Sequence, residues 1–73
     1  MNSLDTMPVG KKVKVKKISK DVPVKRRLLD MGVVPGITVE VIGKAPLGDP
    51  IEILLRGYKL TLRKDEASNI FVE

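Results

Sequence analysis

The segment Arg26-Arg27-Leu28-Leu29-Asp30-Met31-Gly32-Val33-Val34-Pro35-Gly36 decides the fold, because it joins a short basic helix to an abrupt stop. Val24, Leu28 and Met31 recur at i, i+4 and i+7, the spacing of one buried face on a helix over residues 24–31. Gly32 is the left-handed residue expected after the last helical turn. The residues after it are expected to lead back into a sheet, with one of the two valines packed inward.

Alternation of apolar and polar side chains on both sides of this segment predicts short strands. The first covers residues 12–18, where a bulge near Lys16-Lys17 is needed to return Ile18 to the core. Further strands are expected at 37–42, 51–55, 58–63 and 70–72, with a tight hairpin at Arg56-Gly57, core parity for Tyr58 and one helical turn at 64–68. Residues 1–7 read as a lead-in anchored by Leu4. Five strands and one helix indicate a small all-β barrel, since closure protects the strand edges.

A second stretch, Ala45-Pro46-Leu47-Gly48-Asp49-Pro50, predicts a stiff loop between two strands. The two prolines restrict the backbone, and Gly48 supplies a positive φ. Leu47 stands at the expected tip, where a turn has no packing need for a leucine. Two interpretations stay open: the loop maintains the hairpin, or its stiffness lowers the entropy cost of docking onto another protein.

Composition bounds the class of protein. The 73 residues include no histidine, cysteine or tryptophan, and 42% are hydrophobic, which is enough for one small core. We expect a single domain over residues 1–73, with its core in about 4–73. No apolar run approaches the roughly 20 residues that span a bilayer, so the sequence predicts a cytoplasmic protein that does not itself span the membrane.

The formal charge of +5 is concentrated in one part of the chain. Residues 11–27 contain nine lysines and arginines against one acid, whereas residues 49–73 contain four basic and five acidic residues. One end of the domain is therefore expected to be positive. It would favour an acidic protein surface, an anionic lipid layer or nucleic acid.

The order of these motifs resembles the FeoA domain family. The matching residues are Arg27-Leu28, Met31-Gly32-Val33, Pro35-Gly36, Ala45 to Ile51, Gly57, Leu60, Leu62-Arg63, Glu66-Ala67, Ile70 and Val72. The resemblance covers about residues 4–73 and implies an SH3-like five-stranded β-barrel with one short α-helix. It also implies a cytoplasmic accessory or adaptor protein of bacterial or archaeal ferrous iron uptake, which docks on the cytosolic region of the FeoB transporter and modulates it. Met31 departs from the family's usual leucine, a swap that preserves volume.

A tight iron site is not expected in spite of that resemblance. Iron(II) sites draw on imidazole, thiolate and clustered carboxylate ligands, of which only carboxylates are present. Asp65 and Glu66 are adjacent, but acids are favoured in the first turn of any helix. We predict no catalytic, cofactor-binding or metal-ligating residues, no cofactor, and at most weak binding of transition metal ions.

The candidate functional surface combines the basic helix face with the second loop. Its partner-binding residues are predicted to be Lys25, Arg26, Arg27, Val34, Pro46, Leu47, Gly48, Asp49 and Pro50. Structural roles are predicted for Gly32, Pro35, Gly36, Gly57, Arg63 and Glu66, and the last two are expected to pair with each other. Val34 is expected to extend an apolar patch with Leu47 and Leu54.

The residue types present also bear on other classes of protein. An enzyme is not predicted, because no nucleophile–base pair can be assembled without histidine or cysteine. A basic barrel that binds nucleic acid normally stacks bases on aromatic rings. Only Tyr58 and Phe71 are present, so nucleic acid is not the expected partner. Two alternatives stay open: a regulatory module related to the C-terminal SH3-like domain of metal-dependent repressors, with weak transition metal ion binding, and a basic nucleic-acid-binding barrel. A weak homodimer formed through an unpaired strand edge or the apolar patch also stays open.

Overall fold

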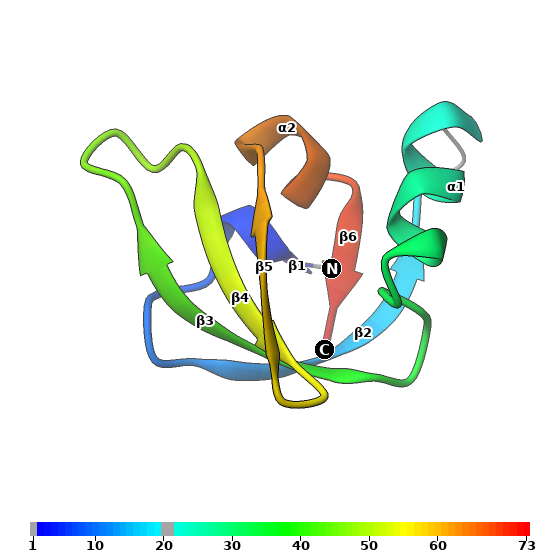
Figure 1. Ribbon diagram of the computed structural model, residues 1–73, viewed down its shortest axis with the longest axis horizontal. Coiled ribbons are helices and arrows are strands. Elements are labelled where there is room, and N and C mark those ends of the chain that lie inside the picture. Colours follow the sequence, from blue (N-terminus) through cyan, green and yellow to red (C-terminus); the bar gives the residue numbers. More distant parts are fainter. Residues whose placement is uncertain (1, 20–21) are drawn as a thin grey trace.

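The architecture is one strongly curved antiparallel sheet that wraps around the core, with short helices beside it (Figure 1). The structure is a computed structural model that describes residues 2–19 and 22–73. Its strands are β1 Asn2–Ser3, β2 Lys12–Ile18, β3 Thr38–Lys44, β4 Ile51–Leu55, β5 Tyr58–Leu62 and β6 Ile70–Val72. Its helices are the 3-10 turn η1 Leu4–Thr6, α1 Val22–Asp30 and α2 Lys64–Ala67. The predicted all-β, SH3-like class with one short helix is confirmed.

The sheet has six strands in the order β1-β6-β2-β3-β4-β5, so the prediction of five strands is wrong by one. The additional strand, β1, lies in the predicted lead-in. Asn2 pairs with Val72 and Ser3 pairs with Phe71, and Leu4 then enters the core with its side chain fully buried. A two-residue strand is too short to show the alternation from which strands are predicted.

Alternation places the core side chains as expected along the central strands. Val13 and Val15 of β2 are buried, and a register shift between Val15 and Lys17 returns Ile18 to the core, which confirms the predicted bulge. Val39 and Val41 of β3 and the three apolar residues of β4 at 51, 53 and 55 complete this face. The charged and polar side chains of these strands point away from the core, toward solvent.

Helix α1 begins at Val22, two residues earlier than predicted, and ends at Asp30. Leu28 is fully buried, while Val24 and Met31 are partly buried and pack against the same core. Gly32 stops the helix with a φ of +92° and donates its N–H to the carbonyl of Leu29 at 3.0 Å. The predicted helix cap, Asp21, lies outside the described residues.

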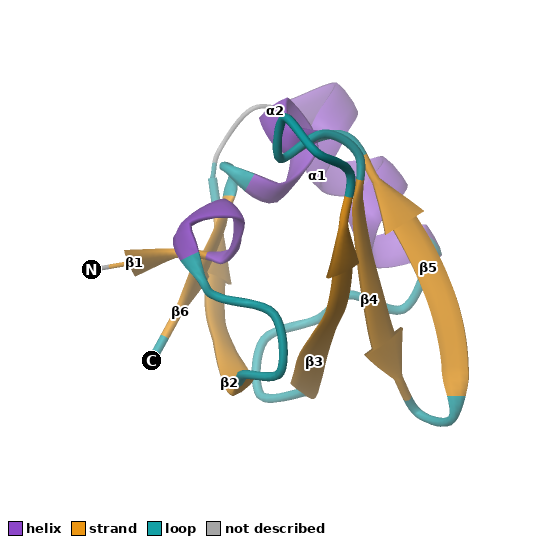
Figure 2. Cartoon of the chain, turned by 90° about the vertical axis from the view of Figure 1, so that its left-hand side faces the viewer, coloured by secondary structure: helices purple, strands orange, loops and turns teal. Residues whose placement is uncertain are grey.

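The β4–β5 hairpin turns at Arg56-Gly57, where both residues have positive φ (50° and 83°), as in the type I′ turn of a two-residue hairpin. Tyr58 follows directly. Its place in the alternation of β5 predicts a buried side chain, but the residue is 44% exposed. The tyrosine stands at the end of the strand, beyond the packed core, and its hydroxyl donates to the carbonyl oxygen of Met31 at 2.7 Å. Figure 2 shows β5 at one edge of the sheet and β1 beside β6 at the other.

Candidate docking surfaces

The loop between β3 and β4 presents Leu47 to solvent on a stiff frame. The N–H of Gly48 donates to the carbonyl of Ala45 at 2.7 Å, and the N–H of Ala45 donates to the carbonyl of Pro50 at 3.1 Å. Gly48 has a φ of +80°, and the Asp49–Pro50 peptide bond is cis. The side chain of Leu47 is 90% exposed at the tip, while the loop backbone beneath it is closed by its own hydrogen bonds.

This loop is also fastened to α2. The carboxylate of Asp49 accepts the N–H of Lys64 at 3.0 Å, so it satisfies one of the free donors at the start of that helix. Asp49 therefore has a structural contact that the sequence did not reveal. Pro46 and Pro50, the other stiff members of the loop, are exposed beside Leu47.

The three basic residues of α1 are exposed, but they are not equivalent. Lys25 and Arg26 make no ion pair among the described residues. Arg27 extends its guanidinium Nη1 to the Oε2 of Glu66 at 3.1 Å, and its side chain stays 60% exposed. The cationic face available to a partner is therefore centred on Lys25 and Arg26.

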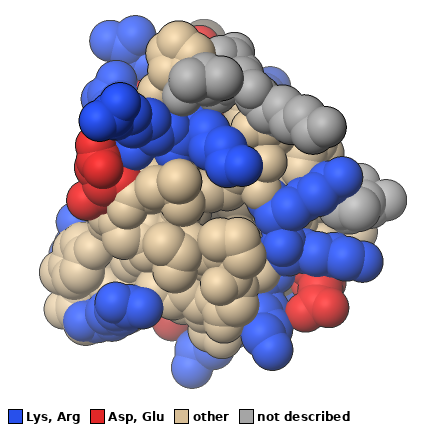
Figure 3. All heavy atoms as spheres, turned by 90° about the vertical axis from the view of Figure 1, so that its right-hand side faces the viewer, with Lys and Arg blue, Asp and Glu red and all other residues tan. Residues whose placement is uncertain are grey.

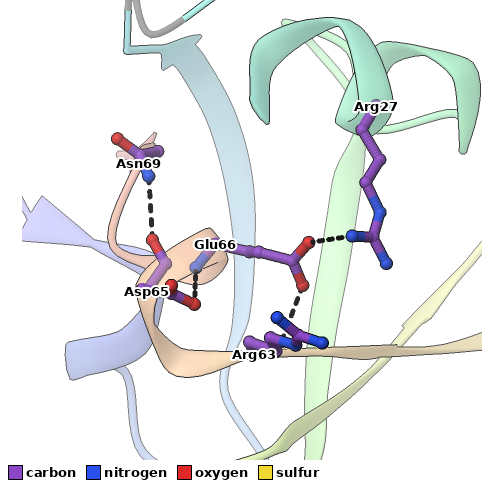
Figure 4. A network of polar contacts seen from close by, with 5 residues as sticks. All are labelled: Arg27, Arg63, Asp65, Glu66 and Asn69. Atoms are coloured by element: carbon purple, nitrogen blue, oxygen red, sulfur yellow. Dashed lines mark hydrogen bonds and ion pairs between the residues drawn. The ribbon is translucent and has the colours of Figure 1, made fainter. Parts of the chain in front are cut away.

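Glu66 holds α1 and α2 together. Figure 4 shows it reaching from α2 toward Arg27, with its other oxygen, Oε1, accepting the backbone N–H of Arg63 at 2.9 Å. Asp65 accepts the N–H of Glu66 at 2.9 Å, which is the first-turn role expected of these acids. The predicted pair of Arg63 and Glu66 thus forms through the backbone of Arg63. The ionic partner of the carboxylate is Arg27, which is far away in sequence and cannot be read from local spacing.

The loop and the helix face do not form one surface. Figure 1 places the β3–β4 loop at one end of the long axis and α1 at the other, and Figure 2 shows the loop on the near side with α1 behind. Val34 lies in the turn after α1, partly buried against the core, and Leu54 is partly buried on β4. The expected patch of Val34 with Leu47 and Leu54 is therefore not brought together.

A different apolar area lies on the α1 side. Figure 3 shows an uncharged region on this face, with lysine and arginine side chains along much of its border and acidic side chains at two places. The exposed large apolar residues on the α1 side are Leu29, at 38%, at the end of the helix, and Tyr58, whose hydroxyl is bonded to Met31 in the turn after it. The sequence already placed Leu29 off the stripe of Val24, Leu28 and Met31, which was an available signal. The exposure of Tyr58 had no such signal.

The described residues give no support for a metal centre. No group of three or more Asp or Glu side chains within residues 2–19 and 22–73 is arranged to hold a metal ion. Asp5, Asp49 and Asp65 do line one open hollow, but Ser3, Lys64 and Glu66 respectively already donate hydrogen bonds to these carboxylates. The two exposed apolar areas, one around Leu47 and one beside α1, are the candidate docking surfaces.

The curved antiparallel sheet with its short helices places the chain in the class of small SH3-like domains. The chain matches the FeoA domain over residues 2–73. It therefore belongs to the FeoA family, whose fold and connection with ferrous iron transport agree with the expectation from the motif order.

Three relatives define the similarity. A fusion of Fe(2+) transport protein A with the Fe(2+) transporter FeoB from Porphyromonas gingivalis is 41% identical over 49 residues, which are 67% of this chain and 6% of the fusion protein. The solution structure of a FeoA-like protein from Clostridium acetobutylicum has a TM-score of 0.91 at 48% identity, covering 97% of this chain and 83% of that one. Stenotrophomonas maltophilia FeoA, an SH3 domain protein crystallised with zinc, has a TM-score of 0.88 at 25% identity, covering all of this chain and 91% of that one.

Metal-dependent repressors share this fold as well. A manganese-dependent transcriptional repressor superposes with a TM-score of 0.89 at 19% identity, and the chain covers 40% of it. Likeness at that level shows the fold alone. In the described part of the chain, no helix is long and apolar enough to cross a membrane.

Proposed function

We propose that this chain is a non-catalytic, cytoplasmic adaptor of ferrous iron uptake that docks on the cytosolic region of a FeoB-type transporter and modulates it. The observation that carries the proposal is Leu47, which is 90% exposed on a loop that its own backbone hydrogen bonds hold closed. The fused relative supports the choice of partner, because it joins a FeoA part and a FeoB part in one polypeptide.

Docking through Leu47 is energetically reasonable. Burial of a fully exposed leucine side chain contributes about 1.5–3 kcal/mol, and the gain is kept only where little ordering entropy is lost. The two loop hydrogen bonds and the Asp49–Lys64 contact order the backbone before any partner arrives. Pro46 and Pro50 flank the leucine and widen the stiff contact area.

Modulation follows if the transporter's cytosolic region has more than one conformation. A bound adaptor shifts such an equilibrium by the difference between its affinities for the two states. The chain needs no reactive group for this role, since its contribution is binding energy alone. Nucleotide turnover by the transporter's cytosolic domain is the readout of that shift.

Isothermal titration calorimetry against the cytosolic domain of the cognate transporter tests the proposal. We expect Leu47→Asp to weaken binding at least about tenfold, because it replaces an apolar contact with a carboxylate that must be desolvated. Val9→Asp is the matched control, since Val9 is also an exposed aliphatic side chain, 55% exposed in the turn before β2. If a folded Leu47→Asp variant binds as tightly as the wild type, the loop is not part of the contact. If the wild type does not bind at all, the adaptor role is refuted.

A further inference from the structure

The α1 side of the molecule carries a composite surface of its own. Tyr58 donates its hydroxyl to the carbonyl of Met31, which fixes the exposed ring against the turn that follows α1. The N–H of Gly36 donates to the carbonyl of Val15 at 2.8 Å, and this contact holds the far end of the same turn on β2. The turn is thus fastened at both ends, and the apolar area it supports is preorganised.

Cationic side chains border this area. We use the name α1 patch for the uncharged residues Leu29 of the last helical turn, Met31, Val34 and Pro35 of the turn after it, and Tyr58, which is hydrogen-bonded to that turn. Lys25 and Arg26 lie on α1 itself, Lys14 and Lys16 flank Val15 on β2, and Arg56 is two residues before Tyr58. All five basic side chains are exposed. The acids near them are Asp30 at the end of α1, Glu40, which lines one hollow together with Arg56, and Glu73, whose N–H donates to the carbonyl of Lys14. Figure 3 shows the result as an uncharged centre inside a mostly positive border.

We propose that the α1 patch is a second docking surface, distinct from the Leu47 loop, and that it takes an acidic protein surface carrying an apolar side chain at its centre. This inference rests on the proposed adaptor function and assigns that occupant to the transporter's cytosolic region. Five cations against three acids leave the border net positive, so carboxylates are its complement. Such complementarity raises the association rate and fixes the orientation of the partner.

The surface fits a protein better than nucleic acid or a membrane. Single-stranded nucleic acid stacks successive bases on several aromatic side chains, whereas Tyr58 is the aromatic residue of the patch. An interfacial helix needs a broad apolar face, yet Leu29 is the exposed large apolar side chain among residues 23–30 of α1. An apolar centre with a polar border is the usual anatomy of a protein–protein interface.

The α1 patch and the Leu47 loop lie at opposite ends of the longest axis, which measures 29 Å. Substitutions separated by more than about 7–10 Å with no shared partner usually have additive effects. The domain is therefore able to contact polypeptide on two sides at once. The fold-losses of affinity caused by substitutions at the two sites are therefore expected to multiply, with no coupling energy between them.

The test measures association of the full chain with the cognate transporter's cytosolic domain at low and high salt. We expect Arg26→Glu to lower the association rate at least about tenfold at 50 mM salt, with most of the loss gone at 0.5 M, because surface charge acts through the screened field. Leu29→Glu is expected to weaken binding at least about fivefold at both salt concentrations, because it removes an apolar contact. Lys11→Glu and Val9→Glu make the same changes in the Pro8–Lys11 turn and serve as controls. The double variant Leu29→Glu, Leu47→Asp is expected to show the product of the single losses.

Several outcomes overturn the inference. If Arg26→Glu and Leu29→Glu bind the transporter domain as well as the control variants do, the α1 patch is not part of the contact. The Leu47 contact is unaffected by that result. Loss of wild-type binding altogether overturns the patch together with the adaptor function. Binding to vesicles of phosphatidylcholine with phosphatidylglycerol, and self-association in sedimentation, are measured as well. If Leu29→Glu abolishes either of these and leaves binding to the transporter domain unchanged, the patch takes a membrane or a second copy of the chain, and the proposed occupant is wrong. Thermal melts followed by circular dichroism establish whether each variant is folded. If Leu29→Glu is unfolded, the salt-dependent effect of Arg26→Glu tests the α1 patch by itself.

Discussion

Glu66 offers the sharpest test of how the two helices are held together. Its side chain is 8% exposed, accepts the N–H of Arg63 at 2.9 Å and pairs with Arg27 at 3.1 Å. In Glu66→Ala, a lost helix cap costs about 1 kcal/mol and a lost ion pair with a mostly exposed arginine about 0.5–1 kcal/mol. The lost burial of side-chain methylenes adds about 1 kcal/mol. We therefore expect Glu66→Ala to lower the free energy of unfolding by about 2–3 kcal/mol.

Glu66→Gln separates these contributions, because glutamine keeps the shape and an oxygen for the N–H of Arg63 but has no charge for Arg27. We expect it to cost about 1 kcal/mol or less. In the double-mutant cycle of Glu66→Gln with Arg27→Met, the coupling energy should be about 0.5–1 kcal/mol and should fall in 1 M NaCl. The value is low because the side chain of Arg27 is 60% exposed.

Urea unfolding followed by far-ultraviolet circular dichroism measures these differences, since the chain has no tryptophan. A loss of 1 kcal/mol shifts the melting temperature of a domain of this size by about 4–8 °C, so Glu66→Ala should melt roughly 10–20 °C lower. A loss below about 0.5 kcal/mol for Glu66→Ala would refute the reasoning. So would a coupling energy of zero between two destabilising single variants, because the Arg27 contact would then contribute nothing.

Two further predictions concern stability. Leu4→Ala should cost about 2–5 kcal/mol in urea unfolding, because Leu4 is fully buried, whereas a mere lead-in would tolerate the change at almost no cost. Gly32→Ala should cost about 1–3 kcal/mol, because it forces a φ of +92° on alanine and puts the new methyl carbon 2.7 Å from the hydroxyl oxygen of Tyr58. Adding Tyr58→Phe should recover part of that loss in the same assay, and no recovery would show that the contact is harmless.

The sequence was informative where a local rule decides the outcome. The bulge before Ile18 follows from a single break in alternation, and the stop at Gly32 follows from the end of the apolar stripe. The exposed tip at Leu47 follows from two prolines around a glycine. In each case the rule involves residues that are neighbours along the chain.

Contacts between distant segments were missed, for the converse reason. Asp49 accepts a hydrogen bond from Lys64, and Glu66 pairs with Arg27, across separations of 15 and 39 residues. The arrangement of the candidate sites was missed for the same reason. Charge and loop composition indicated a basic helix and an apolar loop, but only the curvature of the sheet decides that they face opposite ways.

The order β1-β6-β2 has a consequence for how the domain is made. β6 spans Ile70–Val72, and it occupies the place between the first two strands of the chain. A nascent polypeptide cannot fill that gap until these residues have left the ribosome. Native pairing at this seam must therefore follow synthesis of the barrel, and a chain cut short before residue 70 would keep two early strands with nothing between them.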